Sequence, residues 1–260
     1  MNIFLLALLT ACDNTEPETA PAPEVHTESK PEVEVDDGAV VVGPFTVTPI
    51  YHGTTMVTVG DVTIWIDPWS KAALDDVATA DVVLITDIHS DHYDEEAIAK
   101  VVDAETVFVA PAAVSEKRAE AVQHVLANGE QATVAGITIT AVAMYNLERG
   151  PESGGLYHDK GRGNGYILEM GDTRVYFAGD TECTDEMKAL VDIDAAFLPM
   201  NLPYTMTPEE AAGCVAAFKP ALAVPYHYAG SDLTEFSGGV EGVEGVEVRI
   251  VEFYPGGLPW

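Results

Sequence analysis

The chain has 260 residues, which is enough for one domain of ordinary size and a short additional segment. Hydrophobic residues make up 47% of the sequence, so most of the chain can bury a core. Its 43 acidic residues against 12 basic ones give a formal net charge of −31. Because phosphates would be repelled by such a surface, this charge argues against nucleic acid as a partner.

The first twelve residues are expected to form an export signal. Their apolar run is too short to span a bilayer, and Leu9-Thr10-Ala11-Cys12 resembles a bacterial lipobox. In that interpretation Cys12 becomes the lipidated first residue, and the protein is anchored in the bacterial cell envelope, on its periplasmic or extracellular face. The lipid would then be its only contact with the membrane. No Lys or Arg precedes the run, a departure from such signals that points to a true start further upstream. A fortuitous cysteine after an apolar start is the alternative.

Residues 13–39 are rich in Pro, Glu, Thr and Ala and have no periodic apolar face. Such a composition cannot bury enough surface to order itself, so we expect an acidic disordered tether. Residues 40–260 would then form the folded domain.

Alternating and apolar runs predict the elements of that domain in chain order. Strands are expected at 45–50, 55–59 and 62–66, with a hairpin turn at 60–61, and a buried strand at 81–85. A helix with acids in its first turn follows around 97–101, then a strand at 106–110 and a helix across 112–128. Further strands are expected at 137–142, at 165–170 and 174–178 around a turn at 171–172, and at 195–200, 221–225 and 246–251. Thr207-Pro208-Glu209-Glu210 predicts the start of another helix.

The most informative stretch is Thr86-Asp87-Ile88-His89-Ser90-Asp91-His92, between the strand at 81–85 and the following helix. It places two imidazoles and two carboxylates within six residues, on a loop whose two ends are fixed. Imidazole nitrogen and carboxylate oxygen together suit zinc, manganese or iron(II) better than calcium or magnesium. The alternative is a polar turn whose histidines cap a helix.

This stretch resembles the His-x-His-x-Asp-His signature of the metallo-β-lactamase superfamily, with Asp87 where the first histidine usually stands. The resemblance extends over residues 43–256 and includes Ile66-Asp67-Pro68, Gly179-Asp180 and His227. It is strongest for the branch called metallo-β-lactamase-fold metal-dependent hydrolases. It implies an α/β (α+β) fold, a four-layer αββα sandwich.

The resemblance also implies a site for two divalent ions, zinc first, with manganese or iron(II) as alternatives. Asp91, His92 and His227 would hold one ion, and Asp180 would bridge to the other. Asp91 would also orient the attacking water and carry its proton.

The second ion would be held by Asp87 and His89, with either His158 or Asn146 as a third ligand. Neutral imidazole is the stronger donor, which favours His158. His52 is expected to support the site more than to ligate, and Asp67 to support the histidine loop from behind.

Substrate contacts are predicted from a glycine-rich segment and from two tyrosines. Arg149, Lys160 and Arg162 lie within fourteen residues and would hold an anionic group, unless they pair with surface acids. Tyr204, Tyr228 or Lys160 could stabilise developing negative charge.

Two further cysteines, Cys183 and Cys214, could pair in an oxidising compartment. Cys214 falls in the middle of a predicted helix on an apolar face, which favours a buried thiol, and the disulfide stays open.

The function predicted on this basis is hydrolysis of an ester-type bond, phosphodiester or lactone, in a small or lipid-derived substrate. The alternative is a non-catalytic envelope lipoprotein that binds a metal or a ligand, because Asp87 and Asn146 both weaken nitrogen donation at the second position. An envelope interaction protein is a third possibility.

Overall fold

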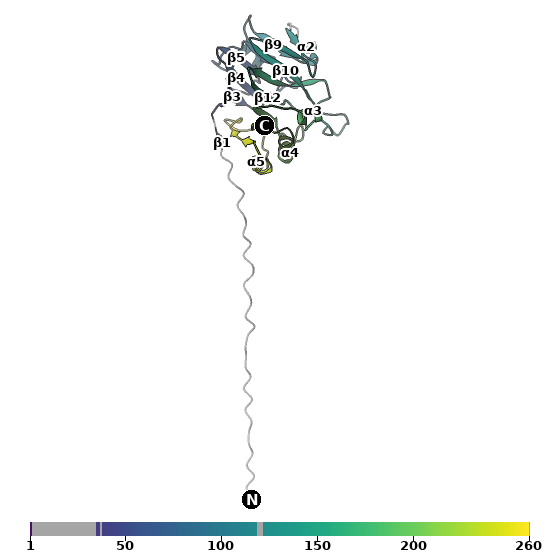
Figure 1. Ribbon diagram of the computed structural model, residues 1–260. Coiled ribbons are helices and arrows are strands. Elements are labelled where there is room, and N and C mark those ends of the chain that lie inside the picture. The colour runs from purple at the N-terminus through teal and green to yellow at the C-terminus, as the bar shows by residue number, and fades with distance from the viewer. Residues whose placement is uncertain (2–34, 37, 119–121, 260) are drawn as a thin grey trace. The chain divides into compact units, whose positions relative to one another are not determined.

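The structure is a computed structural model that describes Met1 and residues 35–36, 38–118 and 122–259. The predicted signal, Cys12 and the tether up to residue 34 lie outside these residues. The described residues from 35 to 259 belong to one compact unit (Figure 1). Within the described part of the chain, no helix is long and apolar enough to cross a bilayer.

Two mixed sheets, each of seven described strands, form the unit. The first sheet has the spatial order β2 (Val40–Val42), β3 (Phe45–Tyr51), β4 (Thr54–Val59), β5 (Val62–Ile66), β6 (Val82–Leu84), β7 (Val107–Ala110) and β8 (His124–Val125). The second has the order β15 (Glu247–Val248), β14 (Leu222–Tyr226), β13 (Ala195–Pro199), β12 (Thr173–Phe177), β11 (Gly163–Met170), β10 (Ile137–Met144) and β9 (Gln131–Val134).

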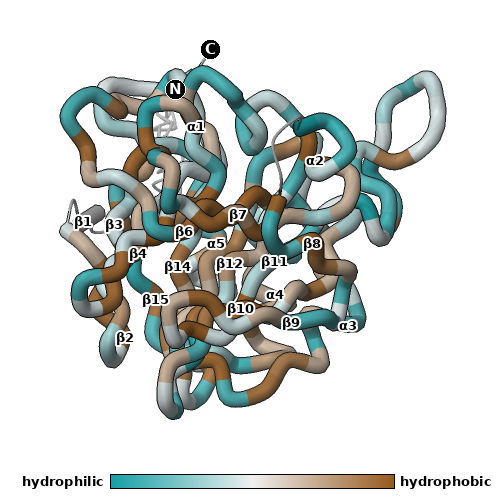
Figure 2. Tube along the Cα trace, turned by 90° about the horizontal axis from the view of Figure 1, so that it is seen from above, coloured by the Kyte–Doolittle hydropathy of each residue, from teal (hydrophilic) through white to brown (hydrophobic). Residues whose placement is uncertain are grey.

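Buried side chains from both sheets belong to one hydrophobic core. Segments of β7 and β10, from different sheets, are hydrophobic in Figure 2. The helices are α1 (Glu95–Val101), α2 (Ala112–Lys117), α3 (Asp185–Lys188), α4 (Pro208–Phe218) and α5 (Leu233–Val240). This arrangement confirms the predicted metallo-β-lactamase-like sandwich.

Local sequence signals account for several of these elements. Asp94 caps α1 by accepting hydrogen bonds from the backbone of Glu96 and Ala97, and Glu95 and Glu96 lie in the first turn. Thr207 and Glu210 form a capping box at the start of α4, with Pro208 at the first helical position. The elements that carry these signals begin where the sequence predicts.

Two sequence expectations need correction. The helix expected across 112–128 ends at Lys117, and His124 instead lies in β8, which pairs in parallel with β7 through Val109. Pairing at the sheet edge overrides the helical pattern there. The tether was expected to extend to residue 39, but β1 (Val35–Asp36) pairs in parallel with β16 (Ile250–Val251).

Candidate metal centre

The candidate ligands lie on loops that follow the carboxyl ends of strands in both sheets. The loop 86–92 follows β6, Asp180 follows β12, and His227 directly follows β14. In parallel strands these ends meet at one edge, where α/β proteins commonly bind ligands. The backbone ties His52, after β3, into this edge, because His227 N–H donates to the His52 carbonyl at 3.2 Å.

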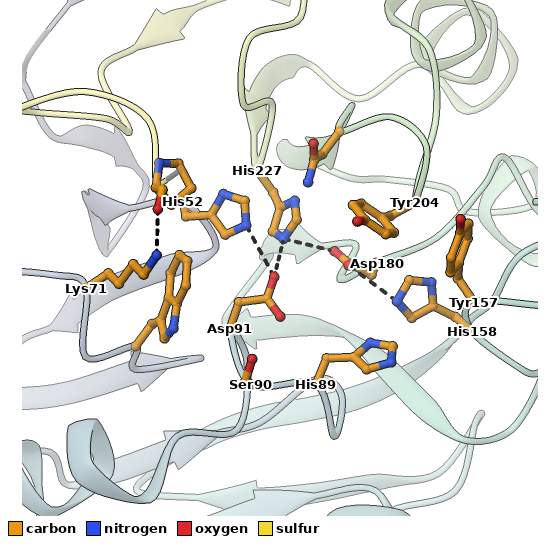
Figure 3. Close-up of a pocket in the computed structure, with 13 residues that line it drawn as sticks. His52, Lys71, His89, Ser90, Asp91, Tyr157, His158, Asp180, Tyr204 and His227 are labelled. Atoms are coloured by element: carbon orange, nitrogen blue, oxygen red, sulfur yellow. Dashed lines mark hydrogen bonds and ion pairs between the residues drawn. The ribbon is translucent and has the colours of Figure 1, made fainter. Parts of the chain in front are cut away.

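One group of side chains surrounds Asp180 and Asp91 (Figure 3). His92 Nε2 lies 3.3 Å from Asp180 Oδ2, and His227 Nε2 lies 3.4 Å from Asp180 Oδ1. Asp91 Oδ2 lies 3.5 Å from His227 Nε2 and 3.8 Å from His92 Nε2. The atoms of His92, Asp180 and His227 are close enough together to hold a metal ion.

A second group adjoins the first. Asp87, His89 and His158 present ligand atoms that lie within 4.8 Å of one another. His158 Nε2 lies 3.4 Å from Asp180 Oδ2, the same oxygen that faces His92. A single carboxylate oxygen therefore lies between the imidazoles of the two groups.

Several of these atoms are buried without a hydrogen-bond partner. Among the described residues, the unpartnered atoms include Nε2 of His92, His158 and His227 and Oδ1 of Asp180. Buried polar atoms normally have partners, and those that lack one call for an explanation such as an ion. Imidazole nitrogens and a carboxylate facing one another are the donor set of zinc and related ions, so the residues fit divalent metal.

Asp67 fixes the ring of His92 from behind. Its Oδ2 accepts from His92 Nδ1 at 2.8 Å, and the carboxylate also accepts from the backbone N–H of Thr86 at 2.8 Å and from its hydroxyl at 2.5 Å. With Nδ1 protonated, His92 presents a lone pair on Nε2 toward Asp180. This is the supporting role expected for Asp67.

Asn146 performs a similar task for His158. Its Oδ1 accepts from the backbone N–H of His158 at 2.8 Å and from ring Nδ1 at 2.7 Å. Its Nδ2 donates to Glu182 Oε1 at 3.0 Å and to the carbonyl of Tyr204 at 2.8 Å. Of the two alternatives for the third ligand of the second group, the geometry therefore favours His158, with Asn146 as its support.

His52 lies against the first group through Asp91. Its Nε2 is 3.3 Å from Asp91 Oδ2, and its Nδ1 is 2.7 Å from the hydroxyl of Tyr254, which itself accepts from the backbone N–H of Ala229. The Tyr254 hydrogen is thus available to Nδ1, which leaves Nε2 protonated to donate to Asp91. Burial and the neighbouring His227 lower the pKa of His52 to about 4, so the ring is neutral at pH 7.

The carboxylates of the first group stay ionised although they are buried. Burial raises the pKa of Asp180, but the facing imidazoles of His227 and His92 outweigh it and hold that pKa well below its usual range. Burial likewise raises the pKa of Asp91, and the neighbouring imidazoles of His92, His227 and His52 lower it further than burial raises it. Ionised carboxylates attract a cation.

A cavity of about 390 Å³ opens onto both groups. Metal-binding candidates and aromatic side chains line it. Tyr157 and Tyr204 pack edge to face at 5.0 Å between ring centroids, and Trp69 lies with Lys71 in the same lining. Sequence reasoning did not single out Trp69, Lys71 or Tyr157, because no local motif marks them.

The predicted basic cluster does not face this cavity as a set of unpaired charges. Arg149 binds Glu210 through Nη2 at 2.7 and 2.9 Å, and Lys160 forms an ion pair with Glu186. Lys160 is also absent from the cavity lining. The alternative weighed for these bases, pairing with acids, describes them better.

Arg162 and Tyr228 also differ from the substrate contacts that the sequence suggested. Arg162 binds Asp87, with Nε donating to Oδ1 at 3.1 Å. The Tyr228 hydroxyl donates to the carbonyl of Val251 and accepts from the backbone N–H of Phe253, each at 3.2 Å, and does not line the cavity. Of the predicted substrate contacts, Tyr204 lies at the cavity.

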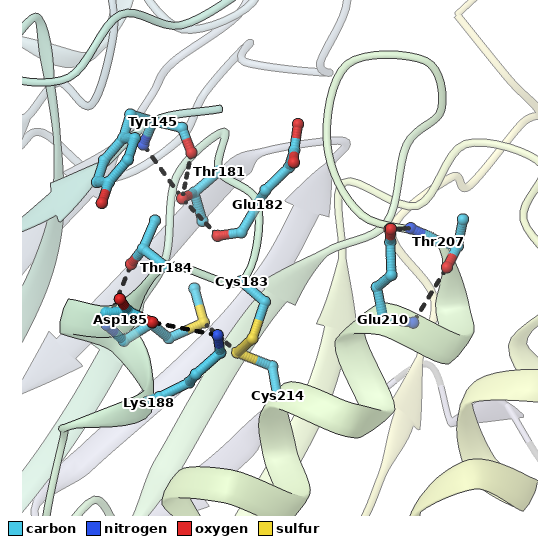
Figure 4. The surroundings of a disulfide bond; sticks show 11 residues. Tyr145, Thr181, Glu182, Cys183, Thr184, Asp185, Lys188, Thr207, Glu210 and Cys214 are labelled. Atoms are coloured by element: carbon cyan, nitrogen blue, oxygen red, sulfur yellow. Dashed lines mark hydrogen bonds and ion pairs between the residues drawn. A yellow bond between two sulfur atoms is a disulfide. The ribbon is translucent and has the colours of Figure 1, made fainter. Parts of the chain in front are cut away.

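Cys183 and Cys214 form a disulfide across 31 residues of sequence (Figure 4). The bond links the loop that follows Asp180 and Glu182 to α4. Cys214 is fully buried, as expected, but as half of a disulfide and not as a free thiol. The sequence left this pairing open, because the expected place of Cys214 on an apolar helix face favoured a buried thiol.

The fold and the paired ligand groups define a metal-dependent hydrolase of the metallo-β-lactamase type. Residues 46–227 match the family described as "Beta-lactamase superfamily domain", and the chain belongs to this superfamily. It is 31% identical over 226 residues to a UPF0173 metal-dependent hydrolase of Methanopyrus kandleri, a match that covers 81% of this chain and 97% of the relative.

Solved structures agree with this membership. A protein from Parabacteroides distasonis, described as a metal-dependent hydrolase, has a TM-score of 0.77 and 36% identity, with 85% of this chain and all of that chain covered (100%). Igni18, a metallo hydrolase from Ignicoccus hospitalis, has a TM-score of 0.66 and 25% identity, with 81% and 96% covered.

Proposed function

We propose that the chain hydrolyses an ester-type bond, a phosphodiester or a lactone, with water activated at a site for two divalent ions. Zinc is the first choice, and manganese and iron(II) are alternatives. The observation that carries the proposal is the set of buried, unpartnered Nε2 atoms of His92, His158 and His227 around Asp180. Such ions would supply Lewis acidity and water of lowered pKa.

The residues of the chain have separable tasks in this proposal. Asp91 lies at the cavity with its carboxylate partly exposed, so it can orient the attacking water and accept its proton. His52, protonated on Nε2, holds Asp91 in place. Tyr204 lines the cavity and carries a hydroxyl that can donate a hydrogen bond to developing negative charge.

The cavity suits a substrate with an apolar body. Trp69, Tyr157 and Tyr204 provide aromatic walls, and Lys71 is the cation among the described lining residues. Its Nζ donates to the carbonyl of Pro259 and lies 5.3 Å from the centroid of the Trp69 ring. This lining is consistent with a small or lipid-derived ester.

We also propose that the protein is a lipid-anchored protein of the bacterial cell envelope, attached through Cys12. The Cys183–Cys214 disulfide supports an oxidising compartment, since stable disulfides are rare in the cytosol. Substitution of Cys12 by Ser should move the protein from the membrane fraction to the soluble fraction of the envelope. Recovery of the variant in the membrane fraction would contradict lipid anchoring.

Hydrolysis is tested with a generic phosphodiester and a generic lactone on protein stripped by a chelator and reloaded with zinc or manganese. We expect turnover that returns with metal and falls by at least about 10³-fold in His92→Ala. His124→Ala is the matched control, because His124 lies in β8 and not in the cavity lining. If fully loaded protein turns over neither substrate, the ester assignment fails and the metal- or ligand-binding lipoprotein becomes the better account.

A further inference from the structure

The side chain of Asp87 forms an ion pair with an arginine. Arg162 donates from Nε to Oδ1 and from Nη2 to Oδ2, each at 3.1 Å, and Nη2 also donates to the carbonyl of Tyr157 at 2.8 Å. The Asp87 side chain is completely buried. A buried, two-pronged ion pair of this kind is strong and geometrically specific.

Asp87 also holds a histidine of the second group. His89 Nδ1 lies 2.7 Å from Asp87 Oδ2, so that oxygen already serves both His89 and Arg162. A carboxylate has about four lone-pair sites, and three of them are engaged here. Asp87 therefore offers less negative charge and fewer free lone pairs to a metal than a carboxylate without a cationic partner.

Among the described residues, no arginine or lysine pairs with the first group. Within that part of the chain, the ion pairs of Asp91 and Asp180 are with histidines, and the ion pair of Arg162 is with Asp87. The position between His92 and His227 thus faces two carboxylates. The position between His89 and His158 shares Asp180 and faces a carboxylate whose charge Arg162 already offsets.

We infer that Arg162 makes the two metal positions unequal, so that the position of His92 and His227 fills first and the position of His89 and His158 is the weaker. This inference rests on the two-ion site of the proposed function. The guanidinium and the second ion compete for the same carboxylate, and both are positive. Arg162 is accordingly a determinant of metal affinity and occupancy, not a contact for substrate.

The test is a titration of metal-stripped protein with Zn²⁺ against a chromophoric chelator, which gives two stepwise dissociation constants without any assay of activity. In the unsubstituted protein we expect the second constant to be at least about 10-fold the first. In Arg162→Met we expect the second affinity to rise by about 10- to 100-fold, because the guanidinium charge no longer opposes the second ion and no longer offsets the charge of Asp87. Arg162→Lys keeps the charge and should keep most of the gap.

Arg174→Met is the matched control, because Arg174 also pairs with a carboxylate, Glu169, but is not part of either group. It should leave both constants unchanged. Equal constants in the unsubstituted protein, or a second affinity that falls or stays the same in Arg162→Met, would overturn the inference.

Arg162→Met leaves the buried carboxylate of Asp87 without its cation and can therefore hinder folding before metal is added. Arg162→Gln removes the positive charge but keeps a side-chain amide that can donate a hydrogen bond to Asp87, and it should show the same rise. No rise in this variant would also overturn the inference. Unequal constants without ester hydrolysis would refute the proposed function alone, and hydrolysis with equal constants would refute this inference alone.

Discussion

Asp67 offers a direct test of how the site is preorganised. Its carboxylate accepts one hydrogen bond from His92 Nδ1 and two from Thr86. In Asp67→Asn, the amide oxygen must serve the Thr86 backbone N–H, since the amide NH₂ would meet another donor there. The NH₂ group then faces His92, which must place its proton on Nε2, the atom that faces Asp180.

The cost of that change follows from the supporting role of Asp67. Loss of the residue that orients a metal-binding histidine typically costs 10- to 100-fold in metal affinity, which corresponds to about 1.4 to 2.7 kcal/mol. We expect Asp67→Asn to raise the smaller of the two Zn²⁺ dissociation constants by this factor in the chelator titration. Asp81→Asn is the control, because Asp81 directly precedes β6 and accepts an exposed hydrogen bond from the backbone N–H of Thr63 in β5. A Zn²⁺ constant within about twofold of the unsubstituted protein would refute the reasoning.

Three further predictions concern other parts of the site. Asn146→Ala should raise the second Zn²⁺ dissociation constant by about 10- to 100-fold in the same titration, because His158 loses its Nδ1 partner. An unchanged dissociation constant would show that Asn146 does not orient the ring of His158. Gly179→Ala should lower the free energy of unfolding in urea by about 2 to 4 kcal/mol, because φ is +66° and a Cβ would lie 2.4 Å from Met144 Sδ. A loss below about 0.5 kcal/mol would contradict that account. Reduction of the disulfide between Cys183 and Cys214 should cost about 3 to 4 kcal/mol in urea unfolding, from the loop of 31 residues that it closes. Coincident curves with and without reductant would speak against it.

The features predicted from sequence are those encoded by neighbouring residues. The loop 86–92 between a strand and a capped helix, the hairpins at 60–61 and 171–172, and the start of α4 all depend on contacts within a few positions. Asp67 was expected behind the histidine loop on resemblance, and its hydrogen bond to His92 Nδ1 agrees with that expectation.

The features that sequence left open or missed depend on distant pairs. Arg162 meets Asp87 across 75 positions, and His52 meets Tyr254 across 202. The prediction of a helix across 112–128 was wrong for the same reason. The conformation of His124 depends on the pairing of β8 with β7, which is distant in sequence. The local sequence of the glycine-rich basic segment does not predict which acidic residues pair with its arginines and lysine.

The most direct test of the central claim is anomalous diffraction at the zinc edge from crystals grown with Zn²⁺ in excess. We predict two peaks on either side of Asp180, one about 2.0 to 2.1 Å from Nε2 of His92 and His227 and the other at about the same distance from Nε2 of His158. The peak at His158 should be the weaker one when Zn²⁺ is limiting. No peak at either position, or zinc bound only elsewhere on this acidic surface, would contradict the account.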